Sequence, residues 1–567
     1  MRAPSLSALL LVAGCSFQST APLDRLENRC GTDADCADGM CDGSICIDAT
    51  GASSVIAIEV VTDSMDSRVD VPGSWVFDFA PLEGASVRDL SLPETRVVLG
   101  NVRWDGVLAP ATLRFVRRVP GAIASVEPVP IDVGTLREPA GTAPDSYDFS
   151  TVLVAGATYE VSVVPTSDIV ISPANEVAPA IRNLPPLYLE VEVQRDGVGA
   201  QRLDVSFPAD LTRQCTGGLQ TGCTLIADVA SFDGEVEQAE PGLQVRAIDR
   251  VSGRVVSSIG ETDLFGTFAI RIGDTTPDYL IRVTSSTGRE LFPAVSVDPE
   301  VVFAGDPDEK VIRIPRLASV QYSGRVQDRD GTPVPSATLR FQTSSVFDES
   351  RLGLQGSFSA STTTNGDGTF SAALLPGFYS VTVLPPEDLQ SPWGVLTYEL
   401  LLGVESEPAG DIVVPSKVQL TGDVRTFEED AAVGATVVAR ARQEEYLTSK
   451  HRSQEAVTNS LGSFTMSMDV GLYDISIKVP STSGHAWLVE PALIMELDTA
   501  RTYRLDPPIP IEGLVLSAEG AIVPNALVRA YTLVSDDTGS RPIQVAETSS
   551  DPDGRYRLLI APRFGDE

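Results

Sequence analysis

The sequence predicts an all-β protein, organised as a tandem array of β-sandwiches that follows a small disulfide-rich segment. Val-rich runs alternate apolar and polar residues, which is the period of a strand with one buried face, and few segments show the helical period. Short turns rich in glycine, asparagine and aspartate separate these runs. A sequence pattern also recurs roughly every 90 residues, which is about the size of one sandwich domain.

Length and charge set the bounds of this array. The chain has 567 residues, enough for about three to five domains of ~100 to 200 residues each. Asp and Glu number 78 against 42 Lys and Arg, which gives a net charge of −36. Nucleic acids and anionic lipid surfaces attract the opposite sign, so we expect no nucleic-acid partner. The hydrophobic fraction of 43% is typical of a folded chain and not of a disordered acidic one.

Residues 1–14 have the features of an export signal. Met1 and Arg2 precede the apolar run LSALLLVAG, which is too short to span a hydrocarbon layer of ~30 Å. The sequence VAGC, ending at Cys15, resembles the bacterial lipobox, in which cleavage precedes the cysteine and lipid is attached to it. We therefore predict a lipoprotein signal peptide, lipid on Cys15 and a tether over 15–29. An ordinary signal peptide that happens to contain a cysteine is the alternative.

The other cysteines fit disulfides in an exported protein, because an even number remains once Cys15 is set aside. They are Cys30, Cys36, Cys41, Cys46, Cys215 and Cys223. The first four lie in CGTDADCADGMCDGSIC, a knot over 30–48 with almost no apolar residues, whose three possible pairings stay open. The last two enclose a Gly-rich loop, where a disulfide would contribute ~2 to 3 kcal/mol. Zinc-finger spacing is not met, so we expect no metal.

A repeated unit runs through the second half of the chain. It begins with a GxV strand, and thirteen residues after its glycine a small residue opens another alternating strand. Clear copies begin at Gly324, Gly422 and Gly513, and looser copies begin at Gly234 and Gly100. The last four starts lie roughly 90 to 98 residues apart, as expected for stacked sandwich domains.

The repeat contains a turn that could be mistaken for a calcium loop. TNGDGTF at 364–370 has the oxygen ligands that calcium prefers. Its counterparts are TDLFGTF at 262–268, TNSLGSF at 458–464 and SDPDGRY at 550–556. Asp367 is replaced by Phe265 and Leu461, which cannot bind calcium, whereas the glycine that supplies a positive φ is kept. We interpret the segment as a hairpin turn, followed by a strand with Tyr379 or Tyr473 facing the core.

These elements together resemble the carboxypeptidase regulatory-like family. The GxV strand, the small residue before alternating hydrophobics, TxxxGxF and PGxYxVxV match well over 319–386 and 417–480, and less closely over 228–284 and 511–562. The match covers about half the chain and is poor before residue 165. The resemblance implies Ig-like, prealbumin-like sandwiches of seven strands, without catalytic residues, used as spacers, accessory domains or surface-binding modules.

The repeats and connectors suggest a division of the chain. We expect 1–14 signal peptide, 15–29 tether, 30–48 Cys-rich knot, 50–186 N-terminal β-sandwich region, 187–227 β connector with the Cys215–Cys223 loop, 228–316, 317–415 and 416–508 β-sandwich repeats, and 509–567 incomplete β-sandwich repeat. Short connectors predict an extended, semi-rigid rod. The last repeat stops where its Tyr-containing strand should begin, so either its edge is open to a partner strand or it is a tolerated incomplete domain.

The sequence contains no recognisable catalytic apparatus. His451 and His485 are the only histidines, both in or near expected loops, where surface positions are usual. GxSxG, HExxH and GxxxxGK motifs are absent from the sequence, so we expect no enzyme, no catalytic residue and no cofactor. Trp393 and Trp487 each follow the Tyr-containing strand of a repeat and are weak candidates for stacking on sugar rings. Core or rim packing is the alternative for both.

We therefore expect a non-catalytic lipoprotein of the bacterial cell envelope, held in the outer membrane by lipid on Cys15 and facing the periplasm or the cell surface. It would act as a structural or adhesive scaffold, with a glycan or a protein as partner. Two alternatives stay open, a carbohydrate-binding accessory lipoprotein and an assembly subunit that accepts a partner strand.

Overall fold

The structure is a computed structural model that describes residues 39–562 apart from a set of short segments. These segments are 43–44, 49–51, 63–70, 80–84, 119–128, 137–145, 168, 172–178, 197–198, 209–212, 218, 233–235, 274–277, 286–290, 304–309, 347–353, 388–390, 406, 443–450 and 537–538. The predicted signal peptide 1–14, Cys15, the tether 15–29, Cys30 and Cys36 lie outside the described residues. No helix among the described residues is long and apolar enough to cross a membrane.

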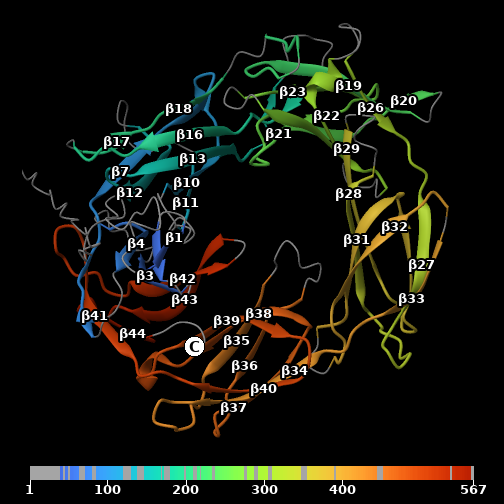
Figure 1. Cartoon of the computed structure of the whole chain (residues 1–567). Helices are drawn as coiled ribbons and strands as arrows, with labels where there is room; N and C mark the ends of the chain where they lie inside the picture. The colour runs from blue at the N-terminus through green and yellow to red at the C-terminus, as the bar shows by residue number, and fades with distance from the viewer. Residues whose placement is uncertain are drawn as a thin grey trace, which may run out of the picture.

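The described chain is nearly all β, as predicted, and its sheets pair into five β-sandwiches, here named modules A to E (Figure 1). A short hairpin of β1 (Gly39–Asp42) and β2 (Ile45–Asp48) precedes them and places Cys41 opposite Cys46 in register. The pairing of the Cys-rich knot stays a prediction, because half of its cysteines are not described.

Module A covers residues 95–207. Its strands are β7 (Thr95–Gly100), β8 (Val102–Trp104), β9 (Val107–Leu108), β10 (Ala111–Arg117), β11 (Ile131–Gly134), β12 (Phe149–Val154), β13 (Thr158–Pro165), β14 (Val170–Ile171), β15 (Ile181–Arg182), β16 (Leu187–Glu192), β17 (Gln201–Arg202) and β18 (Val205–Phe207). A four-stranded sheet, β11-β10-β13-β16, packs over β12-β7-β17 and β18-β8-β9. The three strands β16 to β18 therefore belong to this sandwich and not to a separate connector over 187–227.

Modules B and C share one sheet. Module B contains β19 (Thr224–Phe232), β20 (Glu237–Ala239), β21 (Leu243–Asp249), β22 (Gly260–Glu261), β23 (Thr267–Arg271), β24 (Tyr279–Ser285), β25 (Ala294–Val297), α1 (Pro299–Val302) and β26 (Val311–Pro315). Module C contains β27 (Val320–Gln327), β28 (Thr338–Ser345), β29 (Leu354–Thr363), β30 (Thr369–Leu374), β31 (Gly377–Leu384), β32 (Leu396–Leu402) and β33 (Glu407–Val413). Because β25 pairs with β29, an eight-stranded sheet runs β22-β21-β24-β25-β29-β28-β31-β32, and one hydrophobic core fills both modules.

Module D shows the repeat in its simplest form. Its strands are β34 (Val418–Arg425), β35 (Thr436–Ala441), β36 (Gln454–Val457), β37 (Ser463–Met468), β38 (Gly471–Lys478), β39 (Leu488–Met495) and β40 (Thr499–Arg504), with a 3₁₀ turn at Ser481–Ser483. The sheet β36-β35-β38-β39 packs on β37-β34-β40. The strand period places Tyr473, Ile475 and Ile477 of β38 in the core, each fully buried, as the alternation predicts.

Module E is built from both ends of the described chain. Its C-terminal strands are β41 (Ile509–Leu516), β42 (Leu527–Asp536), β43 (Gly539–Ser549) and β44 (Arg555–Ile560), and its N-terminal strands are β3 (Ala52–Val61), β4 (Ser74–Phe79), β5 (Ser86–Val87) and β6 (Leu90–Ser91). The order β43-β42-β3-β4 matches β36-β35-β38-β39 of module D, and β5 and β6 run parallel to β41 as β40 runs parallel to β34. The N-terminal segment thus supplies the strands that the last repeat lacks.

This sharing corrects three expectations. The predicted region 50–186 is divided, because 52–91 belongs to module E while module A begins at 95. The last repeat is neither incomplete nor in need of a partner strand beside β42, because β3 of the same chain pairs with β42. The modules follow one another around a closed ring in Figure 1 instead of an extended rod. In each module the larger sheet faces the inside of the ring (Figure 1).

The recurrent turn is a hairpin, as interpreted from the sequence. Gly368 has a φ of +79°, and its counterparts Gly266, Gly462 and Gly554 are also in the left-handed region. Asp367 accepts hydrogen bonds from the backbone N–H and hydroxyl of Thr369 at 3.1 and 2.7 Å. The carboxylate therefore closes its own turn.

Candidate functional site

The two tryptophans proposed for sugar stacking lie half-buried in different modules. Trp393 packs against the core of modules B and C, and its Nε1 donates to Asp328 Oδ2 at 3.3 Å. Trp487 packs against the core of module D, donates to the Val479 carbonyl oxygen at 3.3 Å, and lies under the Lys478 ammonium, 4.8 Å from the ring centroid. Each ring is thus fixed by its own module, and the structure does not bring the two together.

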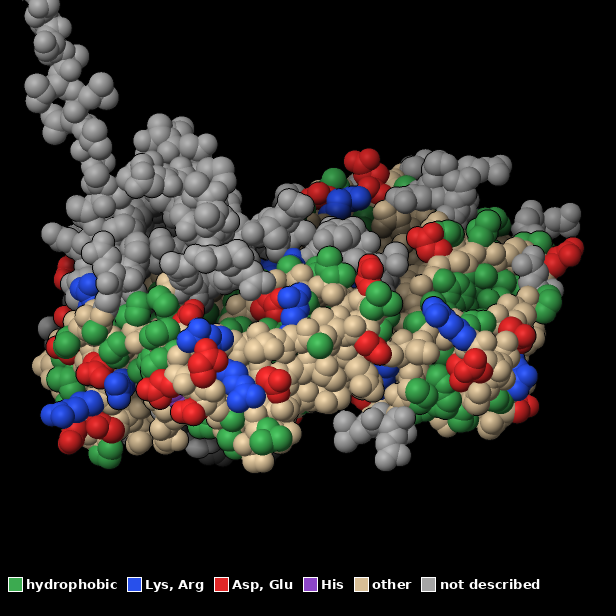
Figure 2. Space-filling view, turned by 60° about the horizontal axis from the view of Figure 1, so that its bottom comes forward, with side chains coloured by type: hydrophobic (Ala, Val, Ile, Leu, Met, Phe, Trp, Pro, Cys, Tyr) green, Lys and Arg blue, Asp and Glu red, His purple; other side chains and the backbone are tan. Residues whose placement is uncertain are grey.

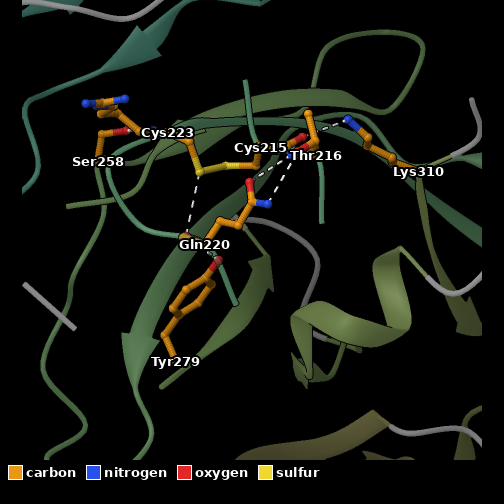
Figure 3. Close-up of a disulfide and its surroundings, with 8 residues drawn as sticks. Cys215, Thr216, Gln220, Cys223, Ser258, Tyr279 and Lys310 are labelled. Atoms are coloured by element: carbon orange, nitrogen blue, oxygen red, sulfur yellow. Dashed lines mark hydrogen bonds between the residues drawn. A yellow bond between two sulfur atoms is a disulfide. The ribbon is translucent and has the colours of Figure 1, made fainter. Parts of the chain in front are cut away.

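Cys215 and Cys223 form the predicted disulfide at the start of module B (Figure 3). Both cysteines are buried, and Lys310 Nζ donates to the Cys215 carbonyl oxygen at 3.1 Å. Inside the loop, Gln220 accepts a hydrogen bond from the Thr216 N–H at 2.9 Å, and its carbonyl accepts from the Tyr279 hydroxyl at 2.9 Å. Burial raises the pKa of Tyr279 to about 12. The disulfide is part of a bonded loop that closes one end of the sandwich.

The histidines differ in their surroundings. His451 is buried against Tyr473, with ring centroids 4.8 Å apart, and its Nε2 lies 2.6 Å from the Leu472 carbonyl oxygen. The expectation of a surface position is wrong for this residue, because the loop carrying it folds over Gly471, where a side chain would collide with the imidazole. The described residues contain no group of three His, Cys, Asp or Glu side chains that could hold a metal ion.

An arginine recurs at one position of the repeat, and the sequence patterns described above did not identify this position as a candidate site. Three residues after Ala111, Ala337 and Ala526, modules A, C and E have an arginine: Arg114, Arg340 and Arg529. Module B has Arg246 at the equivalent position, three residues after Leu243. Module D has Val438 there. Because the residues on either side of this position are buried in the core, the alternation directs it away from the core. This is the side of each larger sheet that faces the inside of the ring (Figure 1).

The eight-stranded sheet of modules B and C concentrates these arginines. Arg246 of β21 lies directly opposite Arg282 of β24, and the same row continues through Ser296 of β25 to Gln355 of β29. Arg340 of β28 lies between Ser361 of β29 and Thr382 of β31. We name this ring-facing surface the arginine face, and define it by Arg246, Arg282, Ser296, Arg340, Gln342, Gln355, Ser359, Ser361, Ser380 and Thr382.

Two clefts adjoin the arginine face. The larger, of about 1160 Å³, lies where modules B and C meet and is lined by Arg340, Gln342, Ser361 and, from module B, Phe292 and Arg316, among others. A smaller cleft of about 450 Å³ between modules C and D also contains Arg340 and Gln342. The two hollows therefore share Arg340 and Gln342 of β28.

Some charged side chains of this region have hydrogen-bond partners and others do not. Arg316 of the larger cleft donates to Ser231 Oγ at 3.0 Å and to Gln238 Oε1 at 2.5 Å, and the buried Glu240 accepts from the same serine at 2.5 Å. Within the described part of the chain, Arg340 makes no hydrogen bond or ion pair, and the buried Nε of Arg246 has no acceptor. The face thus holds cationic groups that the described protein leaves unneutralised.

Carboxylates on a different set of side chains hold neighbouring modules together. Asp469 of module D is buried, accepts from Arg452 on both oxygens at 3.0 Å, and accepts from the Val395 N–H of module C at 3.1 Å. Asp474 of β38 is also buried and forms a bidentate pair with Arg541 of module E. Paired in this way, each carboxylate links its module to the next.

The junction between modules E and A closes the ring. The Arg117 guanidinium of β10 lies 4.1 Å from the centroid of the Trp75 ring of β4. Burial lowers the pKa of Arg117, while the nearby Tyr159 and Glu59 act in the opposite direction. Glu59 of β3 is itself buried and accepts from the Tyr531 hydroxyl at 2.9 Å.

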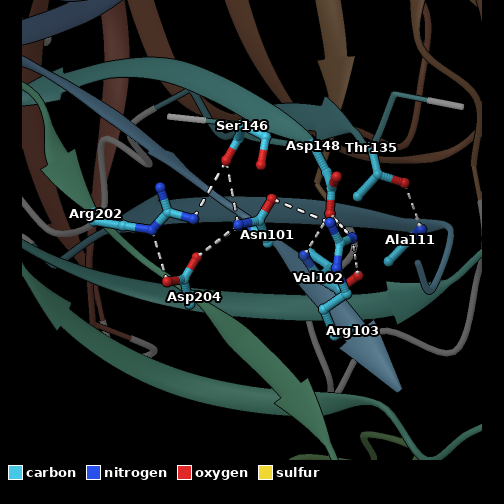
Figure 4. Close-up of polar contacts among 9 residues, drawn as sticks. All are labelled: Asn101, Val102, Arg103, Ala111, Thr135, Ser146, Asp148, Arg202 and Asp204. Atoms are coloured by element: carbon cyan, nitrogen blue, oxygen red, sulfur yellow. Dashed lines mark hydrogen bonds and ion pairs between the residues drawn. The ribbon is translucent and has the colours of Figure 1, made fainter. Parts of the chain in front are cut away.

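A polar cluster inside module A joins strands that are distant in sequence (Figure 4). Asn101 donates its N–H to Asp204 Oδ1 at 3.0 Å, and Asp204 also accepts from Arg202 at 2.7 Å. Asp148 is fully buried, accepts from the Val102 N–H at 3.0 Å, and pairs with Arg103. Because the cluster ties β8 to β17, β18 and the segment before β12, it positions structure and not a reactive group.

Comparisons with known proteins show distant likeness only. No protein family and no curated protein matches the chain. Among solved structures, a streptococcal ancillary pilin is 12% identical and covers 57% of this chain and 99% of its own, with a TM-score of 0.21. The minor pilin GBS52 of Streptococcus agalactiae is 14% identical over 33% of this chain and 95% of its own, with a TM-score of 0.22. The Bacillus anthracis TIE protein is 9% identical over 70% of this chain and 68% of its own, with a TM-score of 0.16.

Proposed function

We propose that this chain is a non-catalytic lipoprotein of the bacterial cell envelope that serves as a structural or adhesive scaffold. The observation that carries the proposal is the way its buried ionic groups are used. Asp469 and Asp474 accept hydrogen bonds from arginines that join successive modules. Buried ionic contacts of this kind fix the relative positions of neighbouring modules, as a rigid scaffold requires.

The repeats support the same role. Their turns, tyrosines and GxV strands resemble the carboxypeptidase regulatory-like family, whose domains are spacers and surface-binding modules. The candidate side chains for chemistry that the sequence offers, His451 and the tryptophans, are packed or bonded within single modules. A scaffold requires rigid, well-packed sandwiches of this kind and no reactive centre.

Membrane anchoring rests on the sequence VAGC at Cys15. Several acyl chains on one cysteine give stable attachment, whereas a single chain binds a bilayer only marginally. With lipid on Cys15, the tether would lead toward β3, so module E would be the module of the ring that is connected to the membrane anchor. The outer membrane is the proposed location, with the ring in the periplasm or at the surface.

The completed edge of module E weakens one earlier alternative. An assembly subunit would accept the strand that the last repeat lacks, and β3 already supplies that strand beside β42, while β44 with Tyr556 remains at the edge of its own sheet. The carbohydrate-binding alternative is taken up below, since it depends on surface chemistry.

The proposal is tested by mass spectrometry of the protein from the membrane fraction of a bacterial host. We expect a mature chain that begins at an acylated Cys15. The Cys15→Ala variant should lose both the acyl mass and membrane retention. A mature chain that begins elsewhere and is recovered from the aqueous fraction would refute the lipoprotein assignment.

A further inference from the structure

The arginine face has a composition unlike that of the chain as a whole. The protein has a net charge of −36, and acidic and basic side chains lie next to one another on the face drawn in Figure 2. The arginine face instead presents Arg246, Arg282 and Arg340 among serine, threonine and glutamine. The sheet itself has its carboxylates at the two margins, Glu261 on β22 and Glu399 on β32, while Glu240 and Glu387 line the adjoining clefts.

Two of these arginines face each other in a position that is unfavourable without an anion. Arg246 and Arg282 are direct cross-strand neighbours, and like charges in that relation destabilise a sheet. Neither arginine forms an ion pair with any residue that the structure describes. Glu261, the carboxylate on the neighbouring strand, pairs with Arg182 at 2.9 Å instead. A bound anion would convert this repulsion into a bidentate contact.

The groups between the arginines fit a ligand rich in hydroxyls. Ser296, Gln355, Ser359, Ser361 and Thr382 lie on the same side of the sheet, since antiparallel partners in register share a face. Hydroxyl and amide groups both donate and accept, as the hydroxyl groups of a sugar do. Neighbouring strands lie about 4.8 Å apart, so the row from Arg246 to Gln355 extends over roughly 15 Å. Ser361, the partner of Arg340, lies six residues further along β29 than Gln355, which is roughly 20 Å.

We propose that the arginine face binds an acidic polysaccharide whose carboxylates lie against Arg246, Arg282 and Arg340. The polysaccharide would run obliquely across the strands, following β29 from Gln355 to Ser361, with its hydroxyl groups bonded to the serine and glutamine side chains. Guanidinium groups pair with carboxylates in a planar, bidentate geometry, which favours uronate groups along the chain. This inference deepens the proposed scaffold function by naming its partner, and it rests on that function.

The surface favours a polysaccharide over an acidic peptide. An extended peptide binds most readily at an open strand edge, where its backbone hydrogen bonds are satisfied. The arginine face lies on the central strands of an eight-stranded sheet, which are paired on both sides, so it offers side chains and no free backbone edge. A polymer that carries its own hydroxyl groups on both sides is satisfied by such a surface.

The test measures binding of the purified full chain to polygalacturonate by calorimetry, with dextran as the uncharged polymer and polyglutamate as the acidic peptide. We expect polygalacturonate to bind, with an affinity that falls as salt is raised, and the other two polymers to bind at least tenfold more weakly. Arg340→Gln and Arg246→Gln should each weaken binding by about tenfold or more. Arg313→Gln, on the outward-facing β26 and paired with Glu237, is the matched control and should leave binding unchanged.

Each other outcome overturns the proposal. Equal binding of polygalacturonate and dextran removes the role of the arginines, and stronger binding of polyglutamate assigns the surface to an acidic peptide. Unchanged affinity in the well-exposed Arg340→Gln variant, which has no described partner to lose, would also contradict it. Because the assay needs no membrane, the Cys15→Ala variant should bind polygalacturonate as the wild type does. A failure of anchoring is thereby distinguished from a failure of polysaccharide binding.

Discussion

At the scale of single residues, buried polar groups are used to hold main chain and modules in place. Tyr379 of β31 is fully buried, and its hydroxyl donates to the Leu375 carbonyl oxygen at 2.7 Å. Tyr473 of β38 makes the same contact with the Asp469 carbonyl oxygen at 2.8 Å. Each tyrosine therefore fastens the turn that precedes its own strand, four residues upstream, besides filling the core.

The buried tyrosines predict a loss of stability at high pH. Burial raises the pKa of Tyr379 to about 12, so the folded state holds this proton more tightly than the unfolded chain, where the pKa is ~10. The contribution is complete below pH ~10 and is lost as the pH rises toward ~12. Denaturant unfolding followed between these pH values should show the decline. Tyr379→Phe should reduce it, at a cost of about 1 kcal/mol near neutral pH for the lost hydrogen bond.

The Asp474–Arg541 pair predicts a strong effect of removing one partner. Asp474 is buried, so Arg541→Gln would leave a carboxylate without its counter-ion between modules D and E. Such changes cost ~3 to 5 kcal/mol for fully buried pairs, and the partial exposure of Arg541 reduces the expectation to about 2 to 3 kcal/mol. Thermal unfolding measures the loss. Arg557→Gln, whose pair with Glu512 is exposed, is the control and should change stability by less than ~0.5 kcal/mol.

At the scale of elements, the same turn, tyrosine strand and GxV strand recur because each solves one steric problem of the sandwich. Gly368 illustrates it, since a Cβ there would lie 2.4 Å from the Val326 carbonyl oxygen of the neighbouring GxV strand. Thr364 at the start of the turn is buried, with its hydroxyl bonded to the Val334 carbonyl oxygen and the Ala337 N–H. The turn thus joins three strands at once.

Gly368→Ala is therefore expected to destabilise module C by about 1 to 3 kcal/mol, through the unfavourable φ and the contact with Val326. Gly366→Ala in the same turn is the matched control, because a Cβ at that position meets no atom within 4 Å. Hydrogen exchange of the β27 and β30 amides would report the difference. Equal protection in both variants would show that the turn adapts to a side chain.

The sequence predicts elements of this kind well and their long-range partners poorly. The alternation around Tyr379, the turn glycines and the Cys215–Cys223 disulfide follow from local patterns, and the structure confirms them. The pairing of β3 with β42 has no local signature, because any alternating strand can complete a sandwich. The arginine position is visible within the repeats, but its meaning depends on which face of each sheet lies inside the ring.

At the scale of the whole molecule, five sandwiches form a ring because β3 to β6 and the C-terminal strands β41 to β44 share one of them (Figure 1). Module E has a single core that combines Ile56, Ile58 and Val60 of β3 with Val528 and Ala530 of β42. Its neighbours contribute Val154 from module A and Val489 from module D. The ring is therefore closed by hydrophobic packing as well as by strand pairing.

Opening this closure should change the shape of the protein. Ile58 of β3 is fully buried in module E, so Ile58→Asp would place a charge in the core and expel the strand. We expect the radius of gyration from small-angle X-ray scattering to increase and β42 to become sensitive to proteolysis. Ile58→Val, which keeps an apolar side chain, should leave both unchanged. An Ile58→Asp variant with the dimensions of the wild type would contradict closure through β3.

Because module E combines N-terminal and C-terminal strands, it also determines the order in which the modules can fold during synthesis. The contact between Glu59 and Tyr531 joins residues 472 positions apart, and domains generally fold as units while the chain emerges from its N-terminus. Modules A to D can fold as they appear, but β3 must wait, unpaired, until β42 has been made. A waiting strand is prone to pair with another chain. Module E can therefore fold only after its C-terminal strands have been synthesised. A chain that stops before β42 leaves β3 unpaired, whereas the full chain pairs β3 without a partner molecule.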